Sequence, residues 1–219
     1  MEDGIMRCAL FAGMCAEEIE ALLGQMACTR RQYEKGEVLL HAGYENRSIG
    51  VVLHGEIEAM KLAADGTQFL TARMGPGGVF GDVLAGSHAT KSPVTVAAAS
   101  PVGALWLPFS ALVGCGQAKL LQNYIALISD KYFALDRRVE LLLCRGVREK
   151  LLYYLKTEAC PVPGGGRRTP FTRAALASYL GCERSALCRE IGRMRKEGLL
   201  RTQGRVFFLS GASNTGNPR

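Results

Sequence analysis

The chain has 219 residues, of which 48% are hydrophobic, and carries a formal net charge of +7. This length accommodates one large domain or two small ones, with enough apolar residues for hydrophobic cores. No apolar run approaches the roughly eighteen residues that a membrane-spanning helix needs, and the opening segment MEDGIMRCALF lacks the basic start and long apolar core of a signal peptide. We therefore expect a cytoplasmic protein that does not bind membranes.

The charge is divided unevenly along the chain. Residues 1–145 contain 13 Lys/Arg and 15 Asp/Glu, whereas residues 146–219 contain 14 Lys/Arg and 5 Asp/Glu, which gives the second segment a net charge of +9. A compact basic segment beside a mildly acidic remainder is typical of a nucleic-acid-binding module attached to a second module.

Cysteine and histidine supply no recognisable metal site. The histidines at 41, 54 and 88 lack ligand spacing, and no nucleophile–base pair is evident. We therefore predict no cofactor, and the alternative of an enzyme built on a metal-binding β-roll has no candidate active site. The eight cysteines contain no Cys-x-x-Cys pair, and we expect free thiols. They are Cys8, Cys15, Cys28, Cys115, Cys144, Cys160, Cys182 and Cys188.

The first half of the chain predicts mainly short strands. Residues 16–26 predict an amphipathic helix with acidic residues in its first turn. From there to about residue 109, short apolar or alternating segments are separated by glycine, which predicts an antiparallel sandwich or roll. The Asp65-Gly66 pair suits a tight hairpin turn, and residues 75–78 (GPGG) cannot form regular structure. The predicted strands are 37–41, 49–53, 56–62, 69–74, 94–99 and 104–107.

The longest predicted element is a helix over residues 119–144. Its apolar residues recur at alternating steps of four and three, a heptad repeat without Gly or Pro, which favours a parallel two-stranded coiled coil and hence a homodimer. Lys131 and Asp136 take positions that would pair across this dimer. The alternative is a core helix packed within one chain, and Tyr124 and Leu143 widen the apolar stripe enough to predict some packing of that kind. The predicted seam is Leu121, Ile125, Ile128, Tyr132, Leu135, Val139 and Leu142.

The segment after this helix predicts a second amphipathic helix over 147–155 and, from its Pro and Gly content, a loop over 160–170. Thr172 can N-cap a helix that ends at Gly181. Residues 201–209, with Gly204 at their centre, predict a wing hairpin, and the last ten residues predict a loose tail.

A second helix over about 184–197, ended by Gly198, follows the turn at Gly181. Its apolar residues face those of the preceding helix, which predicts a helix-turn-helix. The facing residues are Leu176, Ala177 and Leu180 before the turn and Leu187, Ile191 and Met194 after it.

Four segments resemble the cyclic-nucleotide-binding fold: 33–43 (YEKGEVLLHAG), 49–60 (IGVVLHGEIEAM), 74–83 (MGPGGVFGDV) and 91–112. Followed by a long helix, they are arranged as in the Crp–Fnr family of bacterial transcription regulators, over about residues 10–210. The resemblance implies an α+β fold: an effector-sensing antiparallel β-roll (1–117), a coiled-coil dimerisation helix (118–145) and a winged helix-turn-helix DNA-binding domain (146–219). It also implies a homodimer that binds an inverted repeat in double-stranded DNA, with RNA polymerase as a further partner.

The second helix of the helix-turn-helix supplies the candidate base-reading residues. The resemblance implies that the family's base-reading positions are occupied here by Arg184, Ser185, Cys188 and Arg189. Arginine presents a fork that matches guanine O6 and N7. Other residues are better placed for phosphates, which position the protein without specifying sequence; the alternative is that some of these arginines only keep the surface soluble. The phosphate candidates are Thr172, Arg193, Arg195, Arg201 and Arg205.

The effector site departs from the cyclic-nucleotide pattern. In members that bind cyclic nucleotides, a Glu after Phe-Gly binds the ribose and an Arg-Ser pair binds the phosphate; here Asp82 and Lys91 replace the Glu and the Arg. Lysine lacks the planar fork of arginine, and Pro93 removes a backbone donor. We therefore predict an unidentified small effector other than cyclic AMP, with anionic and aromatic molecules as the open alternatives. The predicted pocket is Arg73, Gly81, Asp82, Lys91, Ser92, Tyr132 and Phe133.

Two other sensor chemistries of the family lack their usual residues. An iron–sulfur member would need a compact N-terminal cysteine group, whereas six and twelve residues separate Cys8, Cys15 and Cys28. His88 as a haem ligand is the weaker interpretation, because a histidine in a surface loop is the ordinary case. A regulator that responds to redox state through its cysteines or a metal cofactor is kept as the alternative function.

Overall fold

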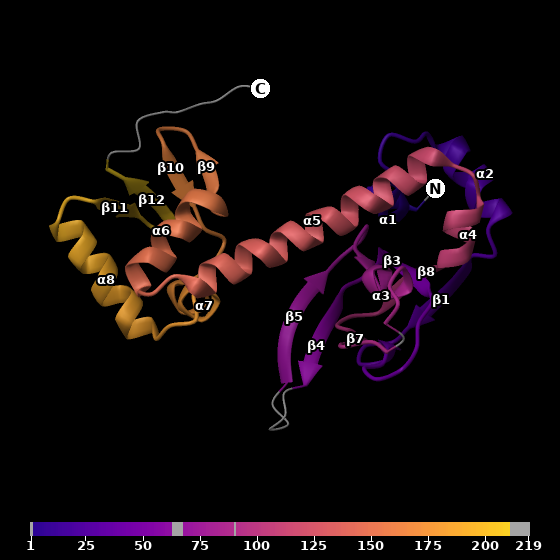
Figure 1. Cartoon of the computed structure of the whole chain (residues 1–219), viewed down its shortest axis with the longest axis horizontal. Helices are drawn as coiled ribbons and strands as arrows, with labels where there is room; N and C mark the ends of the chain where they lie inside the picture. The colour runs from indigo at the N-terminus through magenta and orange to yellow at the C-terminus, as the bar shows by residue number, and fades with distance from the viewer. Residues whose placement is uncertain (1, 63–67, 90, 211–219) are drawn as a thin grey trace. The chain divides into compact units, whose positions relative to one another are not determined.

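The computed structural model describes residues 2–62, 68–89 and 91–210 (Figure 1). The chain folds into two compact units, Met1–Lys131 and Tyr132–Arg219. The predicted Asp65-Gly66 turn and the tail after Ser210 lie outside the described residues.

The first unit is built on two four-stranded antiparallel sheets, with strand orders β1-β8-β3-β6 and β2-β7-β4-β5. This arrangement confirms the predicted antiparallel β-roll, and the long hairpin of β4 and β5 is evident in Figure 1. The strands are β1 Thr29–Tyr33, β2 Val38–Leu40, β3 Ser48–His54, β4 Ile57–Leu62, β5 Gln68–Met74, β6 Val79–Phe80, β7 Thr95–Ala98 and β8 Val102–Pro108.

Short helices complete this unit. The helix predicted over 16–26 is confirmed as α2, Ala16–Gln25. The sequence did not predict β1, whose TRRQY is polar and mostly exposed, or β6, which has only two residues. The other helical segments are α1 Asp3–Met6, the 3₁₀ turn Ala9–Phe11, α3 Asp82–Ala85 and α4 Phe109–Gly114.

Strand β3 is apolar along nearly its whole length because both of its faces are buried. Ile49, Val51 and Leu53 pack into the core that α1, α2 and α4 cover. Val52 points the other way, into the core between the sheets, where it packs with Val102. Successive side chains of a strand face opposite sides, so a strand buried on both faces has a continuous apolar run rather than an alternating one.

Helix α5, Ala118–Leu143, contributes to both units and confirms the long predicted helix. In the first unit Leu120 and Tyr124 are buried, and Ile128 packs against the same core. In the second unit Leu141 is fully buried. The predicted packing of this helix on its own chain is therefore observed at Tyr124, whereas the prediction for Leu143 is wrong, because its side chain is 74% exposed.

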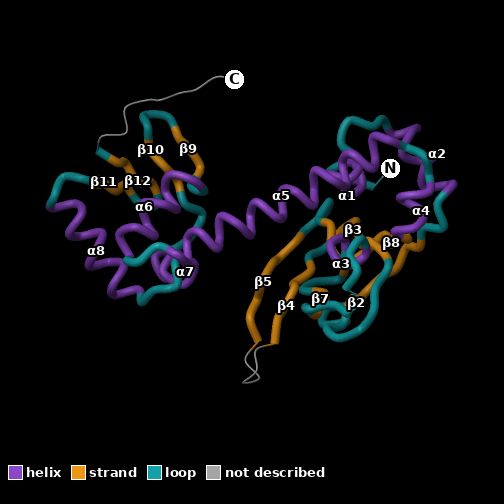
Figure 2. The backbone as a smooth tube through the Cα atoms, viewed as in Figure 1, coloured by secondary structure: helices purple, strands orange, loops and turns teal. Residues whose placement is uncertain are grey.

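The second unit combines helices with a four-stranded sheet of order β11-β12-β10-β9 (Figure 2). The elements are α6 Val147–Thr157, β9 Cys160–Val162, β10 Gly166–Arg168, α7 Arg173–Tyr179, α8 Arg184–Lys196, β11 Leu200–Gln203 and β12 Val206–Leu209. The predicted helix-turn-helix and wing hairpin are confirmed.

The prediction of a loop over 160–170 is wrong, because this segment forms the β9–β10 hairpin. Gly164 and Gly165 make its turn with φ of 81° and 75°, a conformation that glycine adopts without steric cost. Pro161 is tolerated because β9 is the edge strand of the sheet, where a missing N–H breaks no inner ladder.

Candidate DNA interface and effector cavity

The turn between α7 and α8 has the predicted local chemistry. The Thr172 hydroxyl oxygen accepts a hydrogen bond from the Ala175 backbone N–H at 3.2 Å, which caps α7. Gly181 has a φ of 62°, and Ala177 is 2% exposed between the two helices. The predicted contacting residues on both helices are buried in one cluster with Phe207.

Helix α8 separates its apolar and polar residues by face. Leu187, Ile191 and Met194 are buried at 0%, 6% and 0% exposure. All four predicted base-reading residues are exposed: Arg184, Ser185, Cys188 and Arg189. Because residues three or four apart share one side of a helix, Ser185 lies beside Arg189, and Arg184 beside Cys188. The structure therefore brings the four candidates together on the outside of α8.

An arginine on α6 holds this helix in place. Arg148 Nε lies 2.6 Å from Glu190 Oε1, and its two terminal nitrogens lie 2.7 and 2.8 Å from the Glu197 carboxylate oxygens. Bidentate pairs of this kind fix geometry as well as charge, and the bonds from Arg148 lower the pKa of Glu197. Arg148 is not among the residues predicted from the sequence. Glu197, the C-cap of α8, comes seven positions after Glu190, and this spacing places both carboxylates on one side of the helix.

The predicted phosphate-contacting arginines are exposed on α8 and the wing. Arg193 lies 3.3 Å from Glu190, the Arg201 guanidinium lies 4.1 Å from the Phe208 ring centroid, and Arg205 donates to the Pro170 carbonyl oxygen at 2.9 Å. Thr172 and Arg195 are also exposed, the former at the start of α7.

A cluster around Tyr179 joins α5 to the end of α7 within the second unit. Arg138 of α5 donates to the Tyr179 carbonyl oxygen, and its guanidinium lies 4.5 Å from the centroid of that ring. The Tyr179 hydroxyl donates to Glu158, and burial together with this bond raises the pKa of Tyr179 to about 12. The ring also stacks on Phe171. No local sequence pattern signals this cluster, because its members come from separate elements.

In the first unit, a cavity of about 380 Å³ lies between the strands and α3. Four of the predicted pocket residues line it: Gly81, Asp82, Lys91 and Ser92. Gly81 has a φ of 70°, and a Cβ there would lie 2.8 Å from the Asn46 amide nitrogen. This position therefore requires glycine, and it turns the chain so that Asp82 begins α3. Most of the remaining lining is apolar: Leu40, Ala59, Met74, Val79, Phe80, Val83, Leu84, Ala89, Pro93, Val94 and Val96.

The carboxylate in the cavity wall is already paired. Asp82 is 2% exposed, and both of its carboxylate oxygens lie 2.7 Å from Lys131 Nζ. Lys131 therefore pairs within its own chain, and its pairing with Asp136 across a dimer stays a prediction. Lys131 follows Tyr124 and Leu127 at helical spacing, on the side of α5 that packs on its own chain. That spacing was the signal that could have placed Lys131 in the cavity.

Ser92 is committed to its own turn. It is 3% exposed, and its hydroxyl donates to the Val94 carbonyl oxygen at 2.7 Å. The Ser92 hydroxyl oxygen in turn accepts a hydrogen bond from the Val94 backbone N–H at 3.3 Å. Lys91, at the same turn, is exposed.

The structure does not bring every predicted pocket residue to this cavity. Arg73 is exposed on β5 and pairs with Glu58 of β4, so it lies outside the described lining. Tyr132 and Phe133 belong to the second unit, where they are 61% and 54% exposed and their ring centroids lie 5.5 Å apart. Their contact with an effector stays a prediction.

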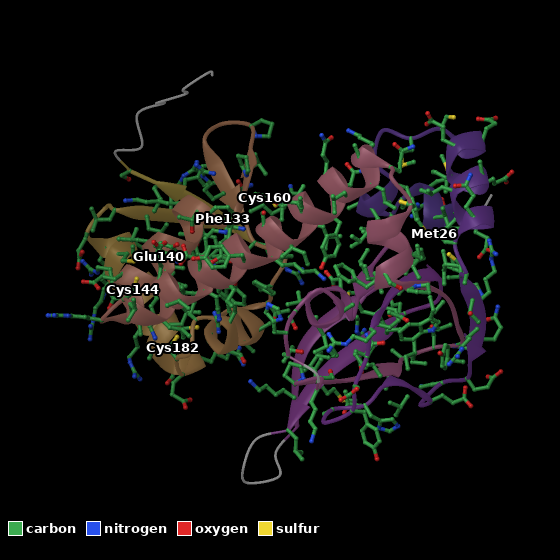
Figure 3. All side chains as sticks on the ribbon, turned by 45° about the vertical axis from the view of Figure 1, so that its right-hand side comes forward. Met26, Phe133, Glu140, Cys144, Cys160 and Cys182 are labelled. Carbon is green, nitrogen blue, oxygen red and sulfur yellow. The ribbon has the colours of Figure 1, made fainter. Side chains whose placement is uncertain are left out.

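The predicted seam of α5 is largely solvent-exposed in the single chain. Six of its residues are between 38% and 63% exposed: Leu121, Ile125, Tyr132, Leu135, Val139 and Leu142. Ile128 is the exception, because it packs against the core of the first unit. Figure 3 labels Phe133 and Glu140 on the part of α5 that belongs to the second unit, and Cys144 directly after the helix ends. Contiguous exposed apolar residues of this kind typically mark an interaction surface.

Within residues 2–62, 68–89 and 91–210, no helix is long and apolar enough to cross a membrane, and no three His, Cys, Asp or Glu side chains are grouped as metal ligands.

Two family descriptions match the chain. Residues 30–117 match the cyclic nucleotide-binding domain, and residues 149–210 match the Crp-like helix-turn-helix domain. The two matches correspond to the β-roll and to the unit that carries α7 and α8.

Several characterised proteins are similar to most of the chain. The fumarate and nitrate reduction regulatory protein of Vibrio cholerae is 26% identical over 195 residues, 85% of this chain and 77% of the relative. The cyclic AMP receptor protein of Thermus thermophilus is 23% identical over 194 residues, 88% of each chain. Electron transport regulator A of Shewanella oneidensis is 23% identical over 187 residues, 82% of this chain and 74% of the relative.

Solved structures share the fold. The catabolite activator protein of Thermus thermophilus aligns with a TM-score of 0.57 and 20% identity, covering 93% of this chain and 94% of that one. The c-di-GMP-responsive regulator CLP of Xanthomonas campestris aligns with a TM-score of 0.55 and 19% identity, covering 90% and 100%.

Proposed function

The chain belongs to the Crp–Fnr family of bacterial transcription regulators, and from that premise we propose that it acts as a homodimer on an inverted-repeat DNA site under the control of a small effector other than cyclic AMP. In this proposal residues 1–117 sense the effector, residues 118–145 dimerise and residues 146–219 bind DNA. RNA polymerase is the proposed further partner of the DNA-bound dimer.

The observation that carries the DNA-binding role is the division of α8 into a buried and an exposed face. Leu187 fixes the helix against α7, and Arg184 and Arg189 remain on the outside. An arginine fork at the N-terminal part of a recognition helix can reach guanine in the major groove. The basic residues around it add the sequence-independent attraction to phosphates.

Dimerisation through α5 is supported by its exposed apolar stripe. Leu135 and Val139, one helical turn apart, are 63% and 47% exposed. The heptad spacing of the stripe suits a parallel pair of helices, which would relate the two copies of α8 by a two-fold axis.

An effector other than cyclic AMP is supported by the state of the polar groups in the cavity. Both carboxylate oxygens of Asp82 already accept hydrogen bonds from Lys131, so fewer of their lone pairs are free for a ribose hydroxyl. The Ser92 hydroxyl already bonds its own turn. A ligand that depends on polar contacts therefore has few free partners in this wall.

The redox alternative is supported by exposed thiols. Cys188 is exposed among the proposed base-reading residues, and Cys15 and Cys160 are exposed elsewhere. Oxidation of Cys188 would add bulk and polarity on the face of α8 that is proposed to enter the groove.

Binding-site selection with the full-length protein and a pool of random duplexes tests the proposed function. We expect an inverted repeat whose half-sites are centred about 34 Å apart, one helical turn of DNA. Binding without sequence enrichment, or enrichment of a single asymmetric site, would contradict a two-fold symmetric, sequence-specific regulator.

A further inference from the structure

The cavity in the first unit offers charge and apolar surface but few free hydrogen-bonding groups. The two serine hydroxyls in its lining both donate to backbone carbonyls, Ser87 to Leu84 at 3.0 Å and Ser92 to Val94 at 2.7 Å. Except for the charged side chains, the rest of the described lining is apolar. A ligand that fills this space therefore gains mainly from apolar contact, and from any charge that matches the wall.

The charges of the described lining do not balance. Lys91 and Lys131 contribute two ammonium groups, whereas Asp82 contributes one carboxylate. The pair of Lys131 with Asp82 is neutral as a whole, so one positive charge is left over. Lys91 carries this excess charge and is exposed, so water screens it in part, and the cavity still favours a singly negative ligand over a neutral one.

Lys131 has the geometry to share its protons with such a ligand. Its ammonium donates to the Val79 carbonyl oxygen at 3.0 Å and to both oxygens of Asp82 at 2.7 Å. An ammonium has three donors, and Asp82 uses two of them. If one of these two turns to a ligand oxygen, Asp82 keeps the other, so neither carboxylate is left buried without a partner.

We propose that the effector is a small apolar monocarboxylate whose carboxylate binds Lys131 and Lys91 and whose apolar part lies against Val79, Phe80 and Leu84. This inference rests on the proposed role of the cavity as the effector site. The cavity, at about 380 Å³, falls within the range of roughly 300–1,000 Å³ that small organic ligands occupy. The ligand would be held directly by α5, the helix that carries the proposed dimer seam.

Other ligand classes fit the described wall less well. A neutral apolar molecule would leave the excess ammonium charge without a partner. A nucleotide would place sugar hydroxyls and base edges against apolar side chains, and the described lining contains no arginine to grip its phosphate. Unpaired polar groups of this kind reduce affinity.

Calorimetry on the full-length protein tests the ligand class with matched probes. The probes are octanoate and 2-naphthoate, each compared with its neutral alcohol, octan-1-ol and 2-naphthalenemethanol, and with cyclic AMP. We expect at least one acid to bind with a Kd below about 1 mM, its alcohol to bind at least about tenfold more weakly, and cyclic AMP to bind more weakly than the acid. Equal binding of acid and alcohol, tighter binding of cyclic AMP, or no binding of either acid would overturn the proposal.

Variants identify the group that holds the carboxylate. Lys131→Met should lower the affinity for the acid at least about tenfold. Lys119 is an exposed lysine of the same helix outside the cavity lining, and Lys119→Met should change that affinity less than about twofold. Asp82→Asn should tighten the acid, because Lys131 is then free to bind it. An acid that binds Lys131→Met as well as the wild type shows that Lys131 is not the anchor.

The double variant Asp82→Asn with Lys131→Met covers the case in which Lys131→Met alone does not fold, because it leaves no buried carboxylate without a partner. It should lose most of the preference for acid over alcohol, and retention of that preference would contradict the role of Lys131. Binding of the wild-type protein to its selected DNA site is measured in parallel without probes. If neither acid binds but the protein binds its DNA site, the proposed ligand class alone is rejected. If the protein shows no sequence-specific DNA binding, the proposed function is rejected.

Discussion

The effector cavity and the exposed face of α8 use their polar side chains in opposite ways. In the cavity, Asp82 bonds Lys131 and Ser92 bonds its own turn. On α8, Arg184 and Arg189 are exposed, and neither forms an ion pair within the described part of the chain. The cavity therefore satisfies most of its polar groups internally, whereas the α8 face presents its polar groups to a partner.

The two surfaces can therefore select their partners in different ways. The phosphate backbone of DNA provides many contacts for exposed cations, so specificity needs only a few added base contacts. A small ligand in an apolar cavity has few contacts in total, and its selection depends on shape and on one charge. The net charges agree with the division: residues 132–219 contain 17 Lys/Arg and 7 Asp/Glu, and residues 1–131 contain 10 and 13.

The exposed apolar stripe of α5 belongs to neither surface, and we expect a second chain to cover it. We expect Leu135→Lys combined with Val139→Lys to give monomers, because each unpaired charge buried at the seam costs about 3–5 kcal/mol. Both residues are exposed in the single chain, unlike Ile128, so the substitutions spare the core of the monomer. Sedimentation velocity at micromolar concentration measures the outcome.

The matched control for this double variant is Ala126→Lys combined with Ala134→Lys, two exposed residues of the same helix outside the heptad seam. It should remain a dimer. If both double variants are dimers, the stripe of α5 is not the dimer interface.

A smaller effect distinguishes the paired charge of the cavity from the exposed charge of α8. Lys131→Met leaves Asp82, which is 2% exposed, without its partner. We expect a loss of about 3 kcal/mol in unfolding free energy, at the low end for a broken ion pair because the Lys131 side chain is itself 41% exposed. Arg189→Met should change stability by less than about 0.5 kcal/mol, as is usual at the surface.

Urea denaturation followed by circular dichroism compares the two variants, and Asp82→Asn added to Lys131→Met should recover most of the loss. Equal stability of Lys131→Met and the wild type would mean that water, rather than Lys131, satisfies Asp82. The conclusion that the cavity pairs its polar groups within the chain would then be wrong.

Most of the DNA-binding unit could be predicted from the sequence because its signals are local. The spacing of Leu187, Ile191 and Met194 identified the buried face of α8, and Gly181 identified the turn before it. The β9–β10 hairpin could not be predicted, because Pro161 and the glycines of this segment are typical of a loop. The strands form because β10 pairs with β12, and β9 then pairs with β10, and neither contact is visible in the local sequence.

The cavity was harder to predict because its key contact is distant in sequence. Lys131 and Asp82 are separated by 49 residues, and the heptad pattern assigned Lys131 to the dimer surface. The same pattern led to Ile128 being placed wholly in the seam, although it packs on its own chain. A helix that serves two surfaces contains two overlapping periodic patterns, and the stronger one conceals the other.

Within the DNA-binding unit, a residue that reads a base and a residue that contacts the DNA backbone should respond differently to substitution. Arg189 lies beside Ser185 on the exposed face of α8, two residues from buried Leu187, so its fork can reach a base edge. Arg189→Ala should cost about 1–3 kcal/mol per half-site and remove the preference at one base pair.

Arg205 on the wing is the matched comparison, because it is also an exposed arginine but donates to the Pro170 carbonyl oxygen in the free protein. That bond holds its guanidinium against the Pro170 backbone, and we therefore expect it to contact phosphates rather than base edges. Arg205→Ala should weaken binding to all DNA sequences alike and reduce the magnitude of the slope of log affinity against log salt concentration by about one. Binding-site selection and fluorescence anisotropy at two salt concentrations separate the two outcomes. If Arg189→Ala keeps the full sequence preference and loses only general affinity, then base reading belongs to another residue of α8, and Arg184 is the next to test because it is exposed one turn closer to the start of the helix.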